Sequence, residues 1–106
     1  MIIKIKEKLT GNEDLLHSIL EKIGCTYIKQ FTNNKGRNFK FGFDMDSSGG
    51  VNVINIESLK FHSFSRDISG DILTLVSTKL NITLGETIKW LAAELNLKFK
   101  YEGFGK

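Results

Sequence analysis

The sequence has no proline, only one cysteine and no long apolar stretch. The single thiol of Cys25 excludes an intrachain disulfide and is typical of an intracellular protein, and we expect it to be a small, buried hydrophobic group. The absence of about 18 consecutive apolar residues excludes a helical membrane span. The N-terminal segment is too short and too rich in lysine for a signal peptide. We therefore expect a cytoplasmic protein without a membrane partner.

Proline is absent, whereas Lys, Ile and Asn are frequent. This bias indicates an AT-rich genome, such as that of a phage. A phage protein would be located in the host cytoplasm. A length of 106 residues predicts one domain, 1–106. The hydrophobic share of 41%, with eight phenylalanines, is sufficient for a packed core without metal or disulfides. The net charge of +3 permits an anionic partner without requiring one.

The N-terminal part of the chain predicts a short strand or arm and then a helix. Residues 2–5 alternate between apolar and basic, which suits a strand. The helix that follows has two competing N-caps, Asn12 and Thr10, and Thr10 stands at capping-box spacing from Glu13. Gly24 is placed to end this helix. Its apolar face consists of Leu15, Leu16, Ile19, Leu20 and Ile23.

Four short strands are predicted in the middle of the chain, at 25–31, 38–43, 51–56 and 59–64. Asn- and Gly-rich turn chemistry at 33–36 and a polar loop at 44–50 separate them. The second strand alternates cleanly, with Phe39, Phe41 and Phe43 on one face and Lys40 on the other. Short strands joined by tight turns predict an antiparallel meander.

Two helices are predicted after the sheet. Ser69 is the expected N-cap of the first, and Asp71 complements its dipole. Thr83 and Glu86 form a capping box for the second. A last short strand is expected at 97–101. The predicted fold class is therefore α+β, with an N-terminal helix, an antiparallel sheet of about four strands and two C-terminal helices.

Segment 61–72 contains an aromatic strand that runs through a small loop into Ser-Gly-Asp and a helix. In this spacing it resembles the second half of the zinc-binding domain of bacterial and phage DNA primases, the CHC2-type zinc finger, in which the strand carries Cys-x-x-Cys. A weaker similarity extends to the helix entry at 81–88 and to the aromatic strand at 38–40. The resemblance covers residues 25–97 and implies a zinc-ribbon-like sheet related to template recognition in DNA replication.

The positions that the resemblance assigns to zinc ligands hold Phe41, Asp44, Ser63 and Arg66. Structural zinc needs about four Cys or His ligands in a tetrahedral array, so we predict a degenerate ribbon without metal or cofactor. Phe41 is expected to fill the volume that the metal cluster would occupy. Asp44 and Asp46 could bind a metal weakly, but we interpret them as solvated loop carboxylates.

Basic and aromatic residues mingle on the predicted sheet. By alternation, Lys40, Lys60 and His62 leave it opposite the phenylalanines. In primases the corresponding face reads single-stranded template, so the resemblance implies a nucleic-acid-binding site, whereas the residues alone favour an ordinary solvated sheet exterior. Arg66 could contact a phosphate or pair with Asp44 or Asp67. The predicted nucleic-acid-binding residues are Lys29, Lys35, Arg37, Lys40, Lys60, His62 and Arg66.

Most of Phe39, Phe41, Phe43 and Phe64 are expected in the core, with one or two as exposed stacking platforms. No histidine stands near a candidate nucleophile, so no catalytic residue is assigned and a non-enzymatic protein is predicted. The main hypothesis is a module that binds single-stranded DNA or another nucleic acid in DNA replication or its regulation. The alternative is a protein-interaction factor that docks on, or inhibits, a primase, helicase or polymerase.

Overall fold

A computed structural model describes residues 1–43, 52–64 and 66–97. Within these residues a five-stranded antiparallel sheet and four helices form an α+β fold, as predicted. The helices are α1 (Ile2–Leu9), α2 (Glu13–Lys22), α3 (Ile72–Leu80) and α4 (Leu84–Glu94). The strands are β1 (Thr26–Asn33), β2 (Gly36–Gly42), β3 (Asn52–Asn55), β4 (Lys60–Ser63) and β5 (Ile68–Asp71).

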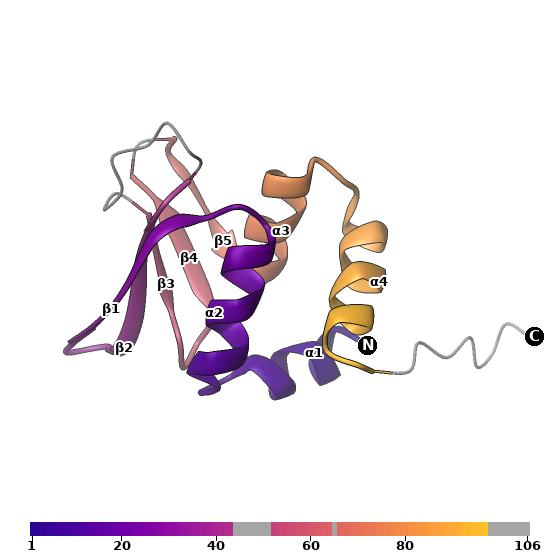
Figure 1. Ribbon diagram of the computed structural model, residues 1–106, viewed down its shortest axis with the longest axis horizontal. Coiled ribbons are helices and arrows are strands. Elements are labelled where there is room, and N and C mark those ends of the chain that lie inside the picture. The colour runs from indigo at the N-terminus through magenta and orange to yellow at the C-terminus, as the bar shows by residue number, and fades with distance from the viewer. Residues whose placement is uncertain (44–51, 65, 98–106) are drawn as a thin grey trace, which may run out of the picture.

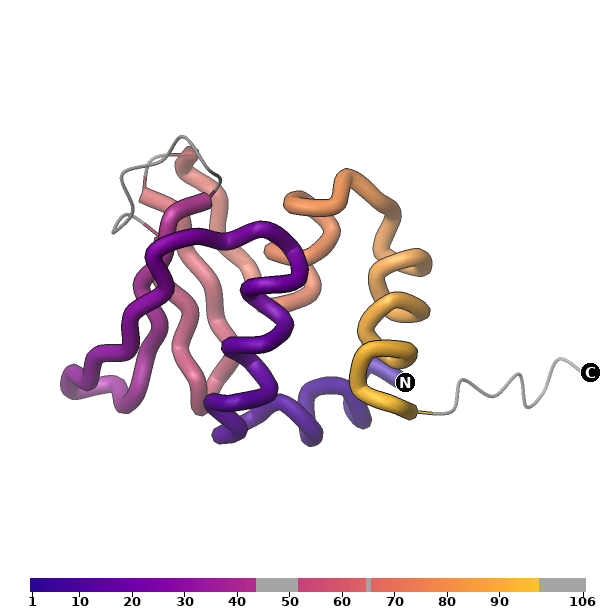
Figure 2. Tube along the Cα trace, in the orientation of Figure 1, coloured from indigo at the N-terminus to yellow at the C-terminus, as the bar shows by residue number. Residues whose placement is uncertain are grey.

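The sheet is a meander in which each strand pairs with the next along the chain, in the order β1-β2-β3-β4-β5. Helices α2, α3 and α4 all lie on one side of it (Figure 1). The tube trace shows that α1 begins near the lower end of α4 and runs below the helices toward the foot of α2 (Figure 2). Within the described part of the chain, helices therefore cover one face of the sheet and none covers the other face (Figure 1).

The hydrophobic core lies between the helices and one face of the sheet. Phe39, Ile54 and Phe61 are cross-strand neighbours in a single row and are buried. Phe41 has no exposed surface, and its ring stacks on Phe61 at a centroid distance of 6.2 Å. Burying a side chain of this size stabilises the fold by roughly 1.5–3 kcal/mol. The predicted core positions of Phe39, Phe41 and Phe43 are confirmed.

Local signals at the helix ends are confirmed at three places. Asn12, not Thr10, is the N-cap of α2, and its Oδ1 accepts a hydrogen bond from the backbone of Leu15 at 3.2 Å. Gly24 follows α2 with φ +92°, a conformation that favours glycine. The capping box of α4 is complete, because the Thr83 hydroxyl accepts from the Glu86 N–H and the Glu86 carboxylate accepts from the Thr83 N–H.

The strand predicted at 2–5 is wrong, because residues 2–9 form helix α1. Ile5 and Leu9, four residues apart, are fully buried, and Ile2 packs beside them against the core. Ile3, which the alternating pattern would not distinguish from them, is 72% exposed. Three apolar side chains at a spacing of three and four thus stabilise a helix with one buried face.

The N-cap predicted at Ser69 is also wrong. Ser69 and Gly70 belong to β5, where they pair with His62 and Phe61. The cap of α3 is Asp71, whose Oδ1 accepts from the N–H groups of Leu73 at 3.0 Å and Thr74 at 3.2 Å. Pairing with β4 extends the strand by two residues beyond the predicted helix start. The predicted loop at 44–50, and the strand predicted at 97–101 beyond Leu97, lie outside the described residues.

Cys25 is buried, as predicted. Burial raises the pKa of its thiol to about 12, and the nearby charge of Lys79 offsets only part of that effect. A thiol with this pKa is protonated at neutral pH and is a poor nucleophile. Cys25 therefore acts as a packing residue.

Candidate nucleic-acid interface

The uncovered face of the sheet, here called the open face, carries a row of residues, all but one of them polar, that crosses the five strands. Directly paired residues on neighbouring strands point to the same side of a sheet. The pairs place Lys29, Lys40 and His62 on the side opposite Phe39 and Phe61. The complete row is Lys29, Lys40, Val53, His62 and Ser69.

A hollow of about 1000 Å³ opens on this face beside the β1–β2 turn. Phe31 and Phe64 supply aromatic surface to it, and Lys35 and Lys60 supply positive charge. Phe64 is 68% exposed, and its ring meets the ring of His62 edge-on at 4.3 Å. A large aromatic side chain that remains so exposed is available to stack on a flat ligand.

The lysines of the open face have no carboxylate partner among the residues that the structure describes. Within the described residues, no acidic side chain lies within 4 Å of the ammonium groups of Lys29, Lys35, Lys40 or Lys60. Four uncompensated cations on one face produce a positive potential that attracts a polyanion.

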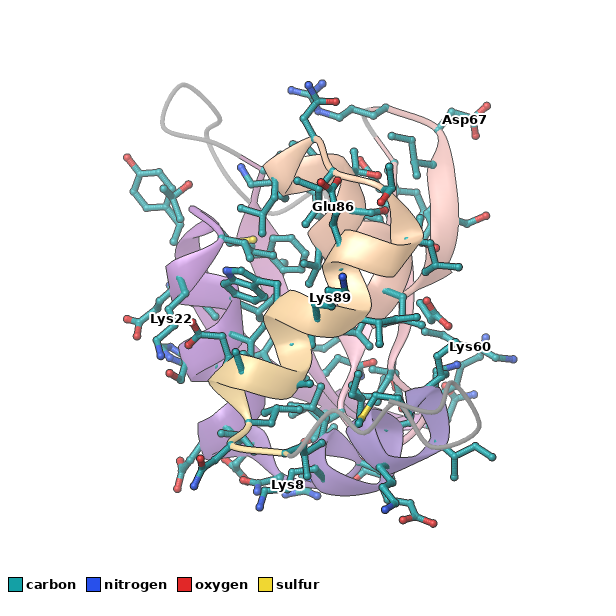
Figure 3. The ribbon with its side chains drawn as sticks, turned by 90° about the vertical axis from the view of Figure 1, so that its right-hand side faces the viewer. Lys8, Lys22, Lys60, Asp67, Glu86 and Lys89 are labelled. Atoms are coloured by element: carbon teal, nitrogen blue, oxygen red, sulfur yellow. The ribbon has the colours of Figure 1, made fainter. Side chains whose placement is uncertain are left out.

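Two carboxylates border this face, and both are paired elsewhere. Glu57 accepts from Arg37, and its pKa is lowered chiefly by that hydrogen bond. Asp71 caps α3 and pairs with Lys6 at 2.7 Å. Asp67 lies near the top of the view in Figure 3, well above Lys60. Among the described residues, the two carboxylates that border this face are thus each paired with a basic side chain.

The helical side has a different charge pattern. Seen from that side, acidic and basic side chains alternate over α2 and α4, as Lys22, Glu86 and Lys89 illustrate (Figure 3). Lys22 also pairs with Glu94 at 2.5 Å. Mixed charge of this kind is typical of an ordinary solvated surface.

The structure brings together five of the seven residues predicted to bind nucleic acid. Lys29, Lys40, Lys60 and His62 lie on the open face, and Lys35 lines the hollow from the β1–β2 turn. This arrangement follows from the alternation of side chains along the strands, which can be read from the sequence.

Arg37 is not part of this group. It points to the helical side, where its guanidinium contacts Glu13 of α2 at 2.7 Å and Glu57 at 2.6 Å and also donates to the Gly11 carbonyl. The pKa of Arg37 is raised chiefly by the hydrogen bond to Glu57. The guanidinium of Arg37 is thus already engaged in contacts that hold the fold together.

Arg66 is also separate from the open face. Its guanidinium carbon lies 4.4 Å from the centroid of the Phe43 ring, and Lys79 approaches the same ring at 4.8 Å. Its backbone N–H donates to Ser63 Oγ at 3.3 Å. The alternative partner Asp44 lies outside the described residues.

Sequence reasoning assigned no role to Phe31 and did not single out Phe64 as the exposed aromatic. Strand alternation could have identified both. Phe31 lies two residues after Lys29 and so points to the same face, and Phe64, just beyond β4, continues the alternation of Lys60 and His62. Sequence reasoning also missed a set of hydrogen-bonded asparagines, Asn33, Asn38 and Asn55, beneath the hollow. Their contacts depend on the hairpin register, which the sequence does not specify.

The described residues contain no cluster of three or more His, Cys, Asp or Glu side chains that could hold a metal ion. None of the helices in this part of the chain has the length and apolarity needed to span a bilayer. Comparison with protein-family models, with curated proteins and with solved structures finds no match to the chain.

Proposed function

We propose that the chain binds single-stranded nucleic acid across the open face of its sheet. The observation that carries the proposal is the row of Lys29, Lys40 and His62, flanked by Lys60 and the exposed ring of Phe64. Lysines hold the phosphates of a strand while aromatic rings stack on its bases. The resemblance of segment 61–72 to the primase zinc-binding domain supports the same function and remains a prediction.

Single strands are favoured over duplexes because of the aromatic surface. Phe64 and Phe31 can stack only on bases that are free of a complementary strand. A duplex would offer phosphates to the lysines but no exposed base planes to the rings. We therefore expect single strands to bind more tightly than a duplex of the same sequence.

Fluorescence anisotropy with a labelled single-stranded oligonucleotide, measured over a range of salt concentrations, tests the proposal. If Lys29, Lys35, Lys40 and Lys60 each neutralise one phosphate, log K falls with log[salt] with a slope of about −2.8. Lys40→Glu combined with Lys60→Glu is expected to weaken binding and to reduce that slope by about 1.4.

The matched control is Lys8→Glu combined with Lys89→Glu, which changes the net charge equally on the helical side (Figure 3). Equal losses in the two double variants would mean that overall charge, not the open face, attracts the strand. No binding of any single strand at low salt would refute the proposal. In that case the same face would be tested for a replication protein as its partner, by capture from nuclease-treated extract.

A further inference from the structure

The side-chain amides on the open face are occupied with one another. Asn38 Nδ2 donates to Asn33 Oδ1 at 3.1 Å and to the Gly36 carbonyl at 2.9 Å. Asn55 Nδ2 donates to Asn38 Oδ1 at 3.0 Å and to the Lys35 carbonyl at 3.1 Å. An amide nitrogen carries two hydrogens, so Asn38 and Asn55 have no donor left for a ligand.

The amide oxygens are engaged as well. Asn33 Oδ1 accepts from both Asn38 and the backbone of Lys35, the latter at 2.9 Å, and Asn55 Oδ1 accepts from the backbone of Ser58 at 2.7 Å. Asparagine reads a base by presenting its oxygen and its nitrogen together. None of these three amides can present such a pair, because Asn33 has used its acceptor and the other two have used their donors.

The two arginines of the predicted site do not supply an alternative reader. Arg37 is held by Glu13 and Glu57 on the helical side, and Arg66 lies over Phe43. The His62 ring and the Ser69 hydroxyl, which face each other across β4 and β5, can each make a single hydrogen bond to a base. Discrimination between bases requires a bidentate contact, which neither provides. The lysine ammonium groups are rotatable point charges that suit any phosphate.

From this accounting of the described residues we infer that the open face binds single strands without reading base identity. This inference rests on the proposed function and specifies it further. Its affinity comes from lysine–phosphate attraction and from stacking on Phe64 and Phe31, and both contacts are available to every nucleotide. The asparagine network serves to hold the β1–β2 turn against β3 and so fixes the wall of the hollow.

The test is a competition experiment with single strands of equal length, comprising oligo-dT, oligo-dC, oligo-dA and several mixed sequences. We expect their affinities to lie within about 5-fold of one another, which is less than one good bidentate base contact provides. Phe64→Ala is expected to weaken binding of every sequence by a similar factor, in the range of about 5- to 150-fold. Leu84→Ala, at an exposed apolar residue of α4, is the matched control and should change nothing.

The possible failures are distinguishable. If no single strand binds, the proposed function itself is wrong. If strands bind but one sequence is preferred by more than about 5-fold, the proposed function stands and the inference is wrong. Loss of that preference in Asn38→Ala or Asn55→Ala, with binding retained, would identify the asparagines as readers and would overturn the inference directly.

Discussion

At the scale of single residues, Asp71 shows how one carboxylate can join three elements. It is the last residue of β5, it caps α3, and its Oδ2 pairs with Lys6 of α1 at 2.7 Å. Burial alone would raise its pKa and is the largest single influence. The hydrogen bond from Lys6, those from the backbone of Thr74 and Leu73, and the charge of Lys6 together lower the pKa below its ordinary value.

A lowered carboxylate pKa makes stability depend on pH. The ionised form is favoured in the folded state, so its contribution is fully present above the unfolded pKa of about 3.9 and is lost as pH falls through the lower folded value. Asp71→Asn keeps an oxygen for the cap but removes the charge. We expect it to lower the free energy of unfolding by up to about 1 kcal/mol at pH 7, since the ion pair is partly exposed.

Urea denaturation at pH 7, 5 and 3 measures this effect. The difference between wild type and Asp71→Asn should shrink below about pH 3.9, where the wild-type side chain also becomes neutral. Adding Lys6→Met to both proteins should remove most of the difference at pH 7. A difference that grows in acid would contradict the assigned role of the charge.

Contacts of single residues also explain why two predicted binding residues, Arg37 and Arg66, are not on the open face. The sequence identifies Arg37 as basic, but not that Glu13 and Glu57 converge on it from a helix and a turn. Lys40 and His62 were placed correctly because strand alternation alone decides their side. Parity along a strand is local information, whereas ion pairing between distant segments is not.

At the scale of elements, the junction between β5 and α3 depends on the absence of a side chain at Gly70. A Cβ at this position would lie 2.3 Å from Thr74 Oγ1 and 2.7 Å from Thr74 Cβ. Such distances require the first turn of α3 to shift. Glycine is used here for close approach between a strand and the helix that follows it.

Gly70→Ala is therefore expected to lower the free energy of unfolding by about 1–3 kcal/mol, the usual cost of overpacking. Gly85→Ala is the matched control, because its new Cβ would meet only Thr83 Oγ1 at 3.9 Å and the change should stabilise α4 by up to about 1 kcal/mol. Chemical denaturation measures both. Thr74→Gly should recover part of the loss in the Gly70 variant, and equal, neutral effects at the two glycines would contradict the close approach.

The sequence predicts the elements whose signals are local. The capping box of Thr83 with Glu86 and the cap at Asn12 mark helix starts because the partners are three residues apart. Prediction from the sequence fails at α1, because over so few residues the positions of Ile2, Ile3 and Ile5 are compatible with both a strand and a helix. It fails at β5, because the strand exists only through pairing with β4.

At the scale of the whole molecule, the two sides of the sheet have different electrostatic character. The net charge of +3 is small; four of the described lysines that lack a carboxylate partner lie on the open face, while the helical side mixes both signs (Figure 3). The hydrophobic core occupies the helical side, so the open face contributes little to stability. Its residues can therefore be exchanged with small effects on folding, which makes the binding tests interpretable.

The core also bears on the prediction of a metal-free fold. Of the positions that the resemblance assigns to zinc ligands, Phe41 is fully buried against Phe61, and Ser63 is buried and accepts from the Arg66 N–H. Neither is a metal ligand. The prediction is that hydrophobic packing between the helices and the sheet face stabilises this sheet without a metal.

We therefore expect the thermal midpoint to be the same after dialysis against a chelator as after dialysis against zinc. Phe41→Ala should lower the free energy of unfolding by about 3–5 kcal/mol in both conditions, because it opens a cavity at the centre of the core. Phe64→Ala is the matched control and should cost less than about 0.5 kcal/mol, since its ring is mostly exposed. A midpoint that falls on chelation, or one tightly bound zinc per chain, would mean that residues other than those at the expected ligand positions hold a metal. Dependence on Phe41 without dependence on zinc would instead assign the stability of the sheet to its aromatic packing.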